Sequence, residues 1–216
     1  MRSPAAAAWR IYRGAPLPVR LHVLVRALTC PLGALLARFP AEGAALDVGC
    51  GHGLLAHLAA RDPRRPRLFL AGIDHDAGKI RAARAVGGSR VRFWALPLEA
   101  LPAAAFDFVS IVDVLYTVRR EAWPGLLAGC RRVLRPGGVL LLKEVIDRPR
   151  WKHRAILLQE TISVRLLGIT RGDPPHFESP AGYARALRQA GFSPFEESPL
   201  VSGHWISHYL ILARRP

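Results

Sequence analysis

Cysteine is scarce in this chain, and its scarcity excludes two kinds of site. Only three cysteines, Cys30, Cys50 and Cys130, occur in 216 residues, and they form no CxxC pair. Neither a zinc site nor a disulfide framework is therefore expected, and no metal is predicted. Thiols without partners fit a reducing compartment, so a cytoplasmic protein is the expectation.

Lysine and acidic residues are also few. Lysine provides three of the 31 basic residues, the others being arginine, and 16 acidic residues leave a net charge of +15. Together with the abundant alanine, this preference for arginine suggests a GC-rich coding bias. The arginines are scattered rather than gathered in one tract, which favours a basic soluble enzyme. An anionic substrate, a membrane surface and a nucleic acid stay open as alternatives.

A long uninterrupted apolar run is missing as well. Residues 17–37 are apolar, but four residues break the run: Arg20, His22, Arg26 and Pro31. These residues argue against a transmembrane helix, and Arg10 and Arg13 interrupt any signal peptide in the same way. Half of the residues are hydrophobic, which fits one domain with a substantial core.

Residues 1–40 are expected to form a helical arm. Pro18–Ala27 has the pattern of an amphipathic helix, and Leu32–Phe39 that of a second, shorter one. In the first helix, Arg20 and Arg26 lie away from the face that four apolar residues share: Leu21, Leu24, Val25 and Leu28. Such a pair of helices could lie on a membrane interface through residues 17–39, or it could cap a cofactor pocket, which we favour.

The most informative pattern lies just after the arm. The apolar run Ala44–Val48 indicates a buried strand, and the alanine-rich run Leu54–Ala60 indicates a helix. Between them, Gly49, Gly51 and Gly53 stand at alternate positions, in a turn that glycine tolerates best. A strand, a glycine turn and a helix bring the backbone close to a nucleotide-like ligand.

Strand and helix patterns alternate from there onward, which predicts an α/β fold with a parallel sheet covered on both faces. Further strands are expected at Arg67–Ile73, Arg90–Phe93, Phe106–Val112, Val139–Glu144, Ser193–Glu197 and Trp205–Ala213. Further helices are expected at Ala77–Val86, Glu121–Leu134, Trp151–Leu167 and Ala181–Ala190. The short linker before the last strand favours an antiparallel return.

Acidic residues follow the second strand. Asp74 lies about 20 residues past the glycine turn, where a carboxylate on the neighbouring strand can accept hydrogen bonds from both ribose hydroxyls. Asp76 is expected to cap the helix that begins at Ala77. His75, between the two, is a further candidate contact to a cofactor.

The sequence LDVGCGHG at residues 46–53, followed by GID at residues 72–74, resembles the first two motifs of class I S-adenosylmethionine-dependent methyltransferases. Four later segments match the same family: Phe106–Val109, Val114–Tyr116, Leu134–Gly138 and Ala190–Phe192. The resemblance covers roughly residues 40–213. It implies a Rossmann-like, doubly wound sheet of seven strands in the order 3-2-1-4-5-7-6, with strand seven antiparallel and helices on both faces.

The resemblance also implies how S-adenosyl-L-methionine is held. Asp74 would take the ribose, and the methionine part would face five residues of the first motif: Asp47, Gly49, Cys50, Gly51 and Gly53. The loop after the third strand would contact adenine. Proline replaces the acid that many relatives carry before the Leu101-Pro102 pair, so the backbone N–H of Leu98, or Glu99, is expected to contact adenine instead.

Residues that follow the fourth and fifth strands face the pocket in this fold. Asp113 is expected to hold the ammonium group of the cofactor, to orient the substrate, or to cap a helix. Four residues are candidates for catalysis: Tyr116, Lys143, Glu144 and His153. Lys143 and Glu144 could instead form a structural ion pair at the pocket rim. His153 has the pKa of a general base and lies in an insertion, residues 147–180, that would cover the substrate.

The predicted function is methyl transfer from S-adenosyl-L-methionine to an oxygen or nitrogen of a small-molecule or lipid-like, hydrophobic acceptor. Residues 41–216 would form the methyltransferase domain. An RNA or protein methyltransferase is the main alternative. The G-x-G-x-G spacing and the lack of a Tyr-x-x-x-Lys pair disfavour a nicotinamide-dependent oxidoreductase. The intact glycine turn and Asp74 disfavour a non-catalytic cofactor-binding module.

Overall fold

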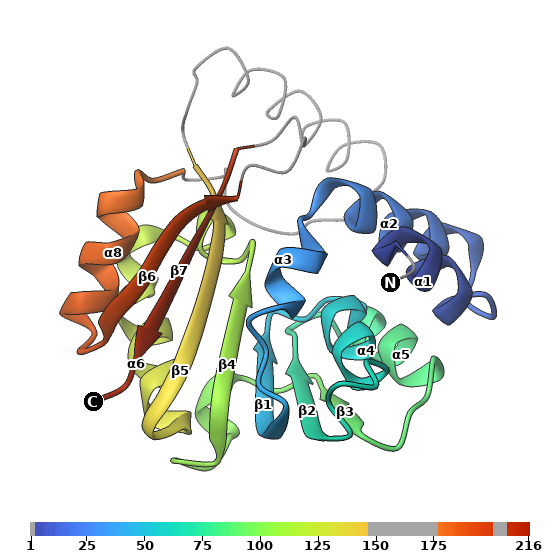
Figure 1. Cartoon of the computed structure of the whole chain (residues 1–216), viewed down its shortest axis with the longest axis horizontal. Helices are drawn as coiled ribbons and strands as arrows, with labels where there is room; N and C mark the ends of the chain where they lie inside the picture. Colours follow the sequence, from blue (N-terminus) through green and yellow to red (C-terminus); the bar gives the residue numbers. More distant parts are fainter. Residues whose placement is uncertain (1–2, 147–176, 201–206) are drawn as a thin grey trace.

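The computed structural model describes residues 3–146, 177–200 and 207–216 (Figure 1). Its centre is a sheet of seven strands in the order β3-β2-β1-β4-β5-β7-β6. The strands are β1 Glu42–Val48, β2 Arg67–Ile73, β3 Val91–Trp94, β4 Phe106–Val112, β5 Leu134–Val145, β6 Ser193–Leu200 and β7 His208–Arg214. β7 runs antiparallel to β5 and β6, while the other paired strands are parallel. The predicted fold class and strand order are confirmed.

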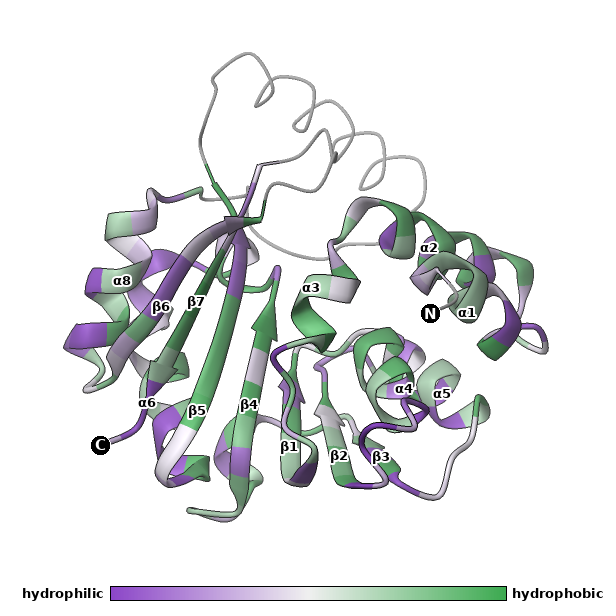
Figure 2. Cartoon of the chain, in the orientation of Figure 1, coloured by the Kyte–Doolittle hydropathy of each residue, from purple (hydrophilic) through white to green (hydrophobic). Residues whose placement is uncertain are grey.

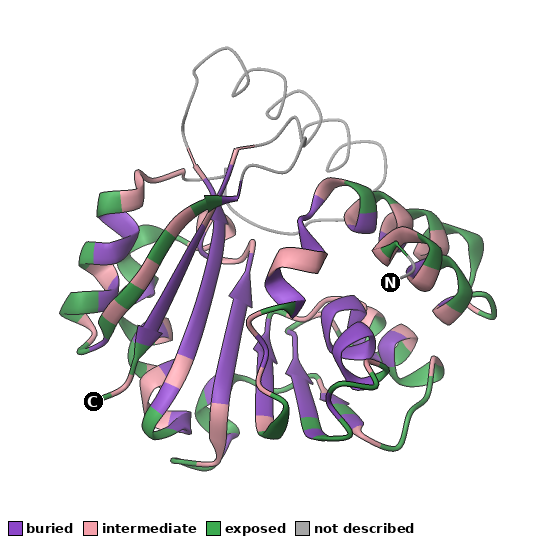
Figure 3. Ribbon diagram, in the orientation of Figure 1, coloured by how far each residue is buried: buried purple, intermediate pink, exposed green. Residues whose placement is uncertain are grey.

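Helices cover both faces of this sheet. One face carries α1 Pro4–Ile11, α2 Leu17–Thr29, α3 Leu32–Leu36, α4 Leu54–Ala60 and α5 Ala77–Ala85, and the other carries α6 Trp123–Val133 and α8 Pro180–Gln189. Neighbouring strand residues enter different cores, as when Ala45 packs with α4 and Leu46 with α6. The central strands are therefore buried (Figure 3) and largely apolar (Figure 2), as parallel strands covered on both faces must be.

Several predicted boundaries differ from the structure, and two of them have a clear physical origin. β5 begins at Leu134 rather than Val139, because Leu134 already pairs with Phe106 across an irregularity in the ladder. The predicted helix Glu121–Leu134 begins as a 3-10 turn, η3 Arg120–Ala122, and becomes α-helical at Trp123. Two further 3-10 turns are η1 Leu98–Ala100 and η2 Leu115–Thr117. The expected helix Trp151–Leu167 lies outside the described residues.

α2 turns its predicted apolar face outward. Val23 and Ala27 are buried against the protein. Three of the four residues of the expected apolar face are exposed instead: Leu21 at 49%, Val25 at 51% and Leu28 at 57%. The face that carries Arg26 lies against the sheet, because its guanidinium pairs there with the Asp113 carboxylate.

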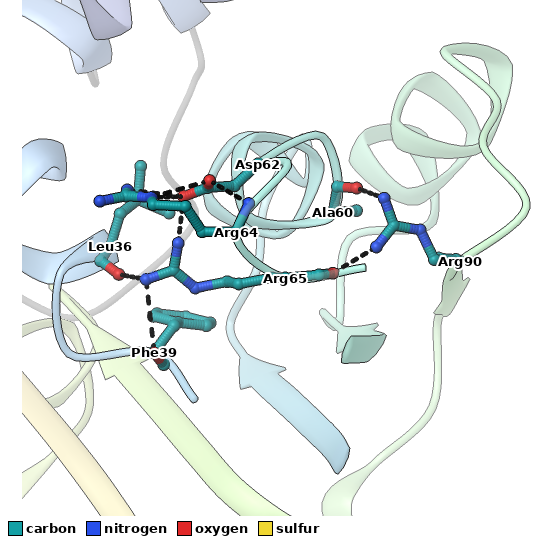
Figure 4. A network of polar contacts seen from close by, with 7 residues as sticks. All are labelled: Leu36, Phe39, Ala60, Asp62, Arg64, Arg65 and Arg90. Carbon is teal, nitrogen blue, oxygen red and sulfur yellow. Dashed lines mark hydrogen bonds and ion pairs between the residues drawn. The ribbon is translucent and has the colours of Figure 1, made fainter. Parts of the chain in front are cut away.

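A buried arginine joins the N-terminal arm to the sheet (Figure 4). Arg65, just before β2, donates to the carbonyl oxygens of Leu36, the last residue of α3, and of Phe39 beyond it, and pairs with Asp62. Arg90 in turn donates to the carbonyl oxygen of Arg65. Because the last carbonyl groups of a helix lack partners within the helix, this one side chain both satisfies them and fixes where the arm sits.

Replacing Arg65 with methionine removes these bonds but keeps an apolar stem. We expect Arg65→Met to lower the free energy of unfolding by about 2 kcal/mol, because buried carbonyl oxygens and Asp62 lose a charged donor. Urea unfolding followed by circular dichroism measures the change. Arg64→Met is the matched control, since Arg64 is exposed and binds the same Asp62. The urea concentration at the midpoint of unfolding of this variant should stay at the wild-type value. Equal shifts in the two variants would contradict the anchoring role of Arg65.

Candidate functional site

A cavity of about 740 Å³ lies where the carboxyl ends of β1, β2 and β4 meet the N-terminal arm. Its lining comes from the glycine turn after β1, the residues after β2 and β4, and the inner side of α2. Ligands of open α/β sheets bind at this edge, between the strands where the order reverses. Here those strands are β1 and β4, so the topology and the cavity identify the same site.

The three glycines of the turn have left-handed backbone angles, with φ of +70° at Gly49, +55° at Gly51 and +77° at Gly53. A Cβ atom on Gly49 would lie 2.5 Å from the Val114 side chain, and one on Gly53 would lie 2.6 Å from Phe93. At Gly51, by contrast, a Cβ would meet nothing within 4 Å. Two glycines are thus required by packing, while the third leaves the backbone open to the cavity.

Asp47, the last acidic residue before the turn, lies in the cavity wall and is only 4% exposed. One of its carboxylate oxygens accepts a hydrogen bond of 2.7 Å from the Ser110 hydroxyl. Burial raises the pKa of Asp47 to about 7, although the bond from Ser110 and the nearby Arg26 oppose that rise. The carboxyl is therefore ready to ionise when a cation enters the cavity.

Asp74 stands beside the turn, at the end of β2. Its carboxylate accepts the backbone N–H of Gly51 at 2.8 Å and that of Asp76 at 2.9 Å. The predicted cap is confirmed, because Asp76 accepts the N–H groups of Gly78 and Lys79 in the first turn of α5. The exposed His75 ring lies 3.5 Å from the Asp74 carboxylate. The Asp74 carboxylate thus holds the backbone of Gly51 in place, and both residues line the cavity.

Asp113 connects three elements at the opposite wall. Its backbone is left-handed, with φ of +58°, and its N–H donates to the Lys143 carbonyl oxygen. Its buried carboxylate binds the Lys143 ammonium at 2.6 Å and the Arg26 guanidinium at 2.5 Å. Burial by itself would raise the pKa of Asp113, but Lys143 and Arg26 outweigh it and hold that pKa well below its usual range.

Lys143 and Glu144 do not pair with each other. Successive side chains of a strand point to opposite faces, so Lys143 reaches Asp113 while Glu144 accepts the backbone N–H groups of Val114 and Leu115. Both side chains are fully buried. Burial and the nearby Asp113 raise the pKa of Glu144 to about 8. The prediction that Lys143 and Glu144 could form an ion pair with each other is therefore wrong. Instead, the two residues hold the loop after β4 from both sides of the sheet.

Of the other predicted site residues, some line the cavity and others do not. Cys50 and Tyr116 line the cavity, and the Tyr116 ring stacks on Phe177 at 5.4 Å between centroids. Leu98 lies in η1, buried against α6, and is not among the residues described as lining the cavity. His153 lies outside the described residues.

Among the cavity residues that were missed from the sequence are two polar ones on α2. His22 and Arg26 both project from the inner side of α2, and the His22 ring lies 4.8 Å from that of His52 in the glycine turn. Burial, followed by the influence of His52, lowers the pKa of His22 to about 4, so its ring is neutral at pH 7. Their spacing of four on one helix was the available signal, because it places them on one face opposite the apolar row.

A seven-stranded sheet in this order, with a glycine turn after β1 and an acid after β2, is the architecture of a methyltransferase that uses S-adenosylmethionine. The chain belongs to the class I S-adenosylmethionine-dependent methyltransferases, and its cofactor is S-adenosyl-L-methionine. The family model described as a methyltransferase domain matches residues 45–138.

Relatives and solved structures agree with that assignment. The ubiquinone biosynthesis O-methyltransferase of Dinoroseobacter shibae is 30% identical over 190 residues, which cover 85% of this chain and 74% of that protein. The enzyme of the same name from Bordetella avium is 28% identical over 186 residues, covering 79% and 74%. Two solved structures share the fold. An S-adenosylmethionine-dependent methyltransferase from Methanosarcina mazei has a TM-score of 0.66 at 18% identity, covering 84% of this chain and 96% of that one. Human N-acetylserotonin methyltransferase in complex with S-adenosylmethionine has a TM-score of 0.65 at 22% identity, covering 95% and 57%.

The raised pKa of Asp47 predicts a pH dependence of stability. In the unfolded chain this carboxyl ionises near 3.8, but in the folded chain it ionises only near about 7. Over that window the unfolded state has lost the proton that the folded state still holds, so stability falls as the pH rises. Asp47→Asn cannot ionise. The free energy of unfolding of Asp47→Asn, relative to that of the wild type, should therefore rise by a few kcal/mol between about pH 4 and pH 7, as measured by urea unfolding.

Asp107→Asn is the control for this measurement. The Ala44 N–H and Arg135 hold the pKa of Asp107 below its ordinary value, against the opposing effect of burial, so no such gain is expected for that variant across the same window. A difference between wild type and Asp47→Asn that stays constant with pH would contradict a neutral Asp47 in the folded protein.

Proposed function

We propose that this enzyme methylates a hydroxyl oxygen of a small-molecule, apolar or lipid-like acceptor. The observation that carries the proposal is the apolar part of the cavity lining, to which Val23, Leu32, Val112 and Val114 contribute. An acceptor with a hydrophobic body fits such a wall. Oxygen as the acceptor atom is supported by the relatives, which are named ubiquinone biosynthesis O-methyltransferases.

The residues around the turn fit the charges and hydroxyls of S-adenosylmethionine. We assign the ribose to Asp74, whose carboxylate already fixes the Gly51 N–H beside the cavity. The buried Asp47 is suited to the ammonium group of the methionine part, and Arg26 offers a guanidinium to its carboxylate. The open side of Gly51 leaves room for a ligand against the backbone.

When bound, S-adenosylmethionine supplies a methyl group activated by a positively charged sulfur. What the chain must add is alignment of the acceptor, exclusion of water, and a place for the hydroxyl proton. Tyr116, which lines the cavity, and His153 are the proposed groups for acceptor binding and proton transfer. Lys143 and Glu144 are buried, so we assign them to holding Asp113 and the loop after β4 in position.

The arm and the insertion are proposed to complete the acceptor site. Residues 1–40 contribute the α2 wall, and residues 147–180 are proposed to cover the acceptor. Methyl transfer to RNA or protein is the alternative, because the net charge of +15 would suit a polyanion.

Product analysis with methyl-labelled S-adenosylmethionine tests the proposal. The full chain is offered, in separate reactions, a phenol with an alkyl chain, an alkylamine of matched length, bulk tRNA and a protein extract. We expect label in the methyl ether of the phenol, because the apolar part of the cavity lining favours the alkyl chain and the proposed proton acceptors suit a hydroxyl.

The amine, which carries the same alkyl chain, is the matched control for simple hydrophobic binding. Label found mainly in the amine would refute oxygen as the acceptor atom. Label found mainly in tRNA or protein would refute a small apolar acceptor.

A further inference from the structure

The outward side of α2 carries a row of large apolar side chains in water. Leu17, Leu21, Val25 and Leu28 are 58%, 49%, 51% and 57% exposed. Their spacing of four, four and three residues places them on one face of the helix. We refer to these four residues as the outer row. Trp9 of the neighbouring α1 is also 45% exposed. A contiguous apolar surface of this kind marks an interaction site.

The opposite side of the same helix is already occupied. His22, Val23 and Arg26 line the cavity, and Arg26 is fixed by its ion pair with Asp113. α2 therefore cannot rotate to bury the outer row without breaking that buried pair and opening the cavity wall. The exposure of the row follows from how the site is built, so only something outside the described chain can cover it.

The charge around the outer row is of one sign. The first 41 residues contain six arginines and no acidic residue. Arg10 in α1 and Arg13 in the turn before α2 are exposed, and the Arg20 guanidinium lies 4.0 Å from the centre of the Trp9 ring. A second copy of this chain would bring the same positive charge to the contact and be repelled. An anionic lipid surface complements both the apolar row and the arginines.

We propose that α2 lies flat on an anionic bilayer, with the outer row in the apolar boundary and Arg10 and Arg13 on lipid phosphates. None of the described helices is long and apolar enough to cross a membrane. Figure 1 shows α1 and α2 side by side at the end of the molecule away from α8. Docked in this way, the cavity behind α2 lies next to the lipid, and a lipid-like acceptor would reach it directly.

The use of this surface rests on the proposed apolar acceptor, but the surface itself is tested without any acceptor. The full chain is sedimented with vesicles of pure phosphatidylcholine and with vesicles of equal parts phosphatidylcholine and phosphatidylglycerol. We expect binding to the anionic vesicles that weakens with added salt, and little binding to the neutral ones.

Paired variants separate the apolar and the electrostatic contributions. Leu21→Gln combined with Val25→Gln should weaken vesicle binding by at least about tenfold, because two apolar side chains no longer enter the boundary. Phe69→Gln is the matched control, since Phe69 is 51% exposed on β2. Arg13→Gln should weaken binding to anionic vesicles by about fivefold, whereas Arg185→Gln, exposed on α8, should not.

Three results would overturn the proposal. The first is equal binding to both kinds of vesicle, and the second is no binding to either. The third is a dimer in sedimentation velocity that the double variant abolishes, which would make a second copy the occupant of the row. Methyl transfer to a water-soluble phenol by the double variant at the wild-type rate, together with lost vesicle binding, would show that docking and the proposed chemistry are separate properties.

Discussion

The ion pairs of Asp113 with Arg26 and Lys143 hold this site together. The three charged groups come from α2, from the end of β4 and from β5, and the Lys143 side chain has no exposed surface. A buried charge is tolerated only when it is paired, so each member of the cluster depends on the other two. The cluster also fixes the left-handed backbone at Asp113 by the bond from its N–H to the Lys143 carbonyl oxygen.

This constraint explains why one helix serves two surfaces. Arg26 can reach Asp113 only if the polar side of α2 faces the sheet, and that orientation completes the cavity with His22 and Val23. The same orientation leaves the outer row in solvent. Arg65 supports this arrangement from a distance, because it binds the carbonyl groups of Leu36 and Phe39 and so fixes the end of the arm relative to the start of β2.

Much of the fold follows from local patterns in the sequence. The runs that became β1, β2 and β4 are apolar and bounded by glycine, proline or aspartate, and the turn at Gly49, Gly51 and Gly53 needs the left-handed angles that glycine adopts freely. The cap at Asp76 is equally local, since its carboxylate binds N–H groups two and three residues away. Such features depend on neighbours in the chain.

The features that were missed depend on partners distant in the sequence. Amphipathic spacing shows that α2 has two faces, but only the position of Asp113 decides which face turns inward. Likewise, the adjacent charges of Lys143 and Glu144 suggest a pair, although strand alternation separates them and gives each a different partner. The cavity shares this dependence, because its lining comes from α2 as well as from the strand ends.

The account as a whole rests on S-adenosylmethionine being held at the glycine turn by Asp74. Calorimetric titration of S-adenosylmethionine into the wild type, Asp74→Ala and Asp76→Ala tests this most directly. We predict that Asp74→Ala weakens binding by about 1–3 kcal/mol, because the ribose hydroxyls lose a buried acceptor. Asp76→Ala, which removes only the cap of α5, should bind like the wild type. An unchanged Kd for Asp74→Ala, or an equal loss in both variants, would contradict the account.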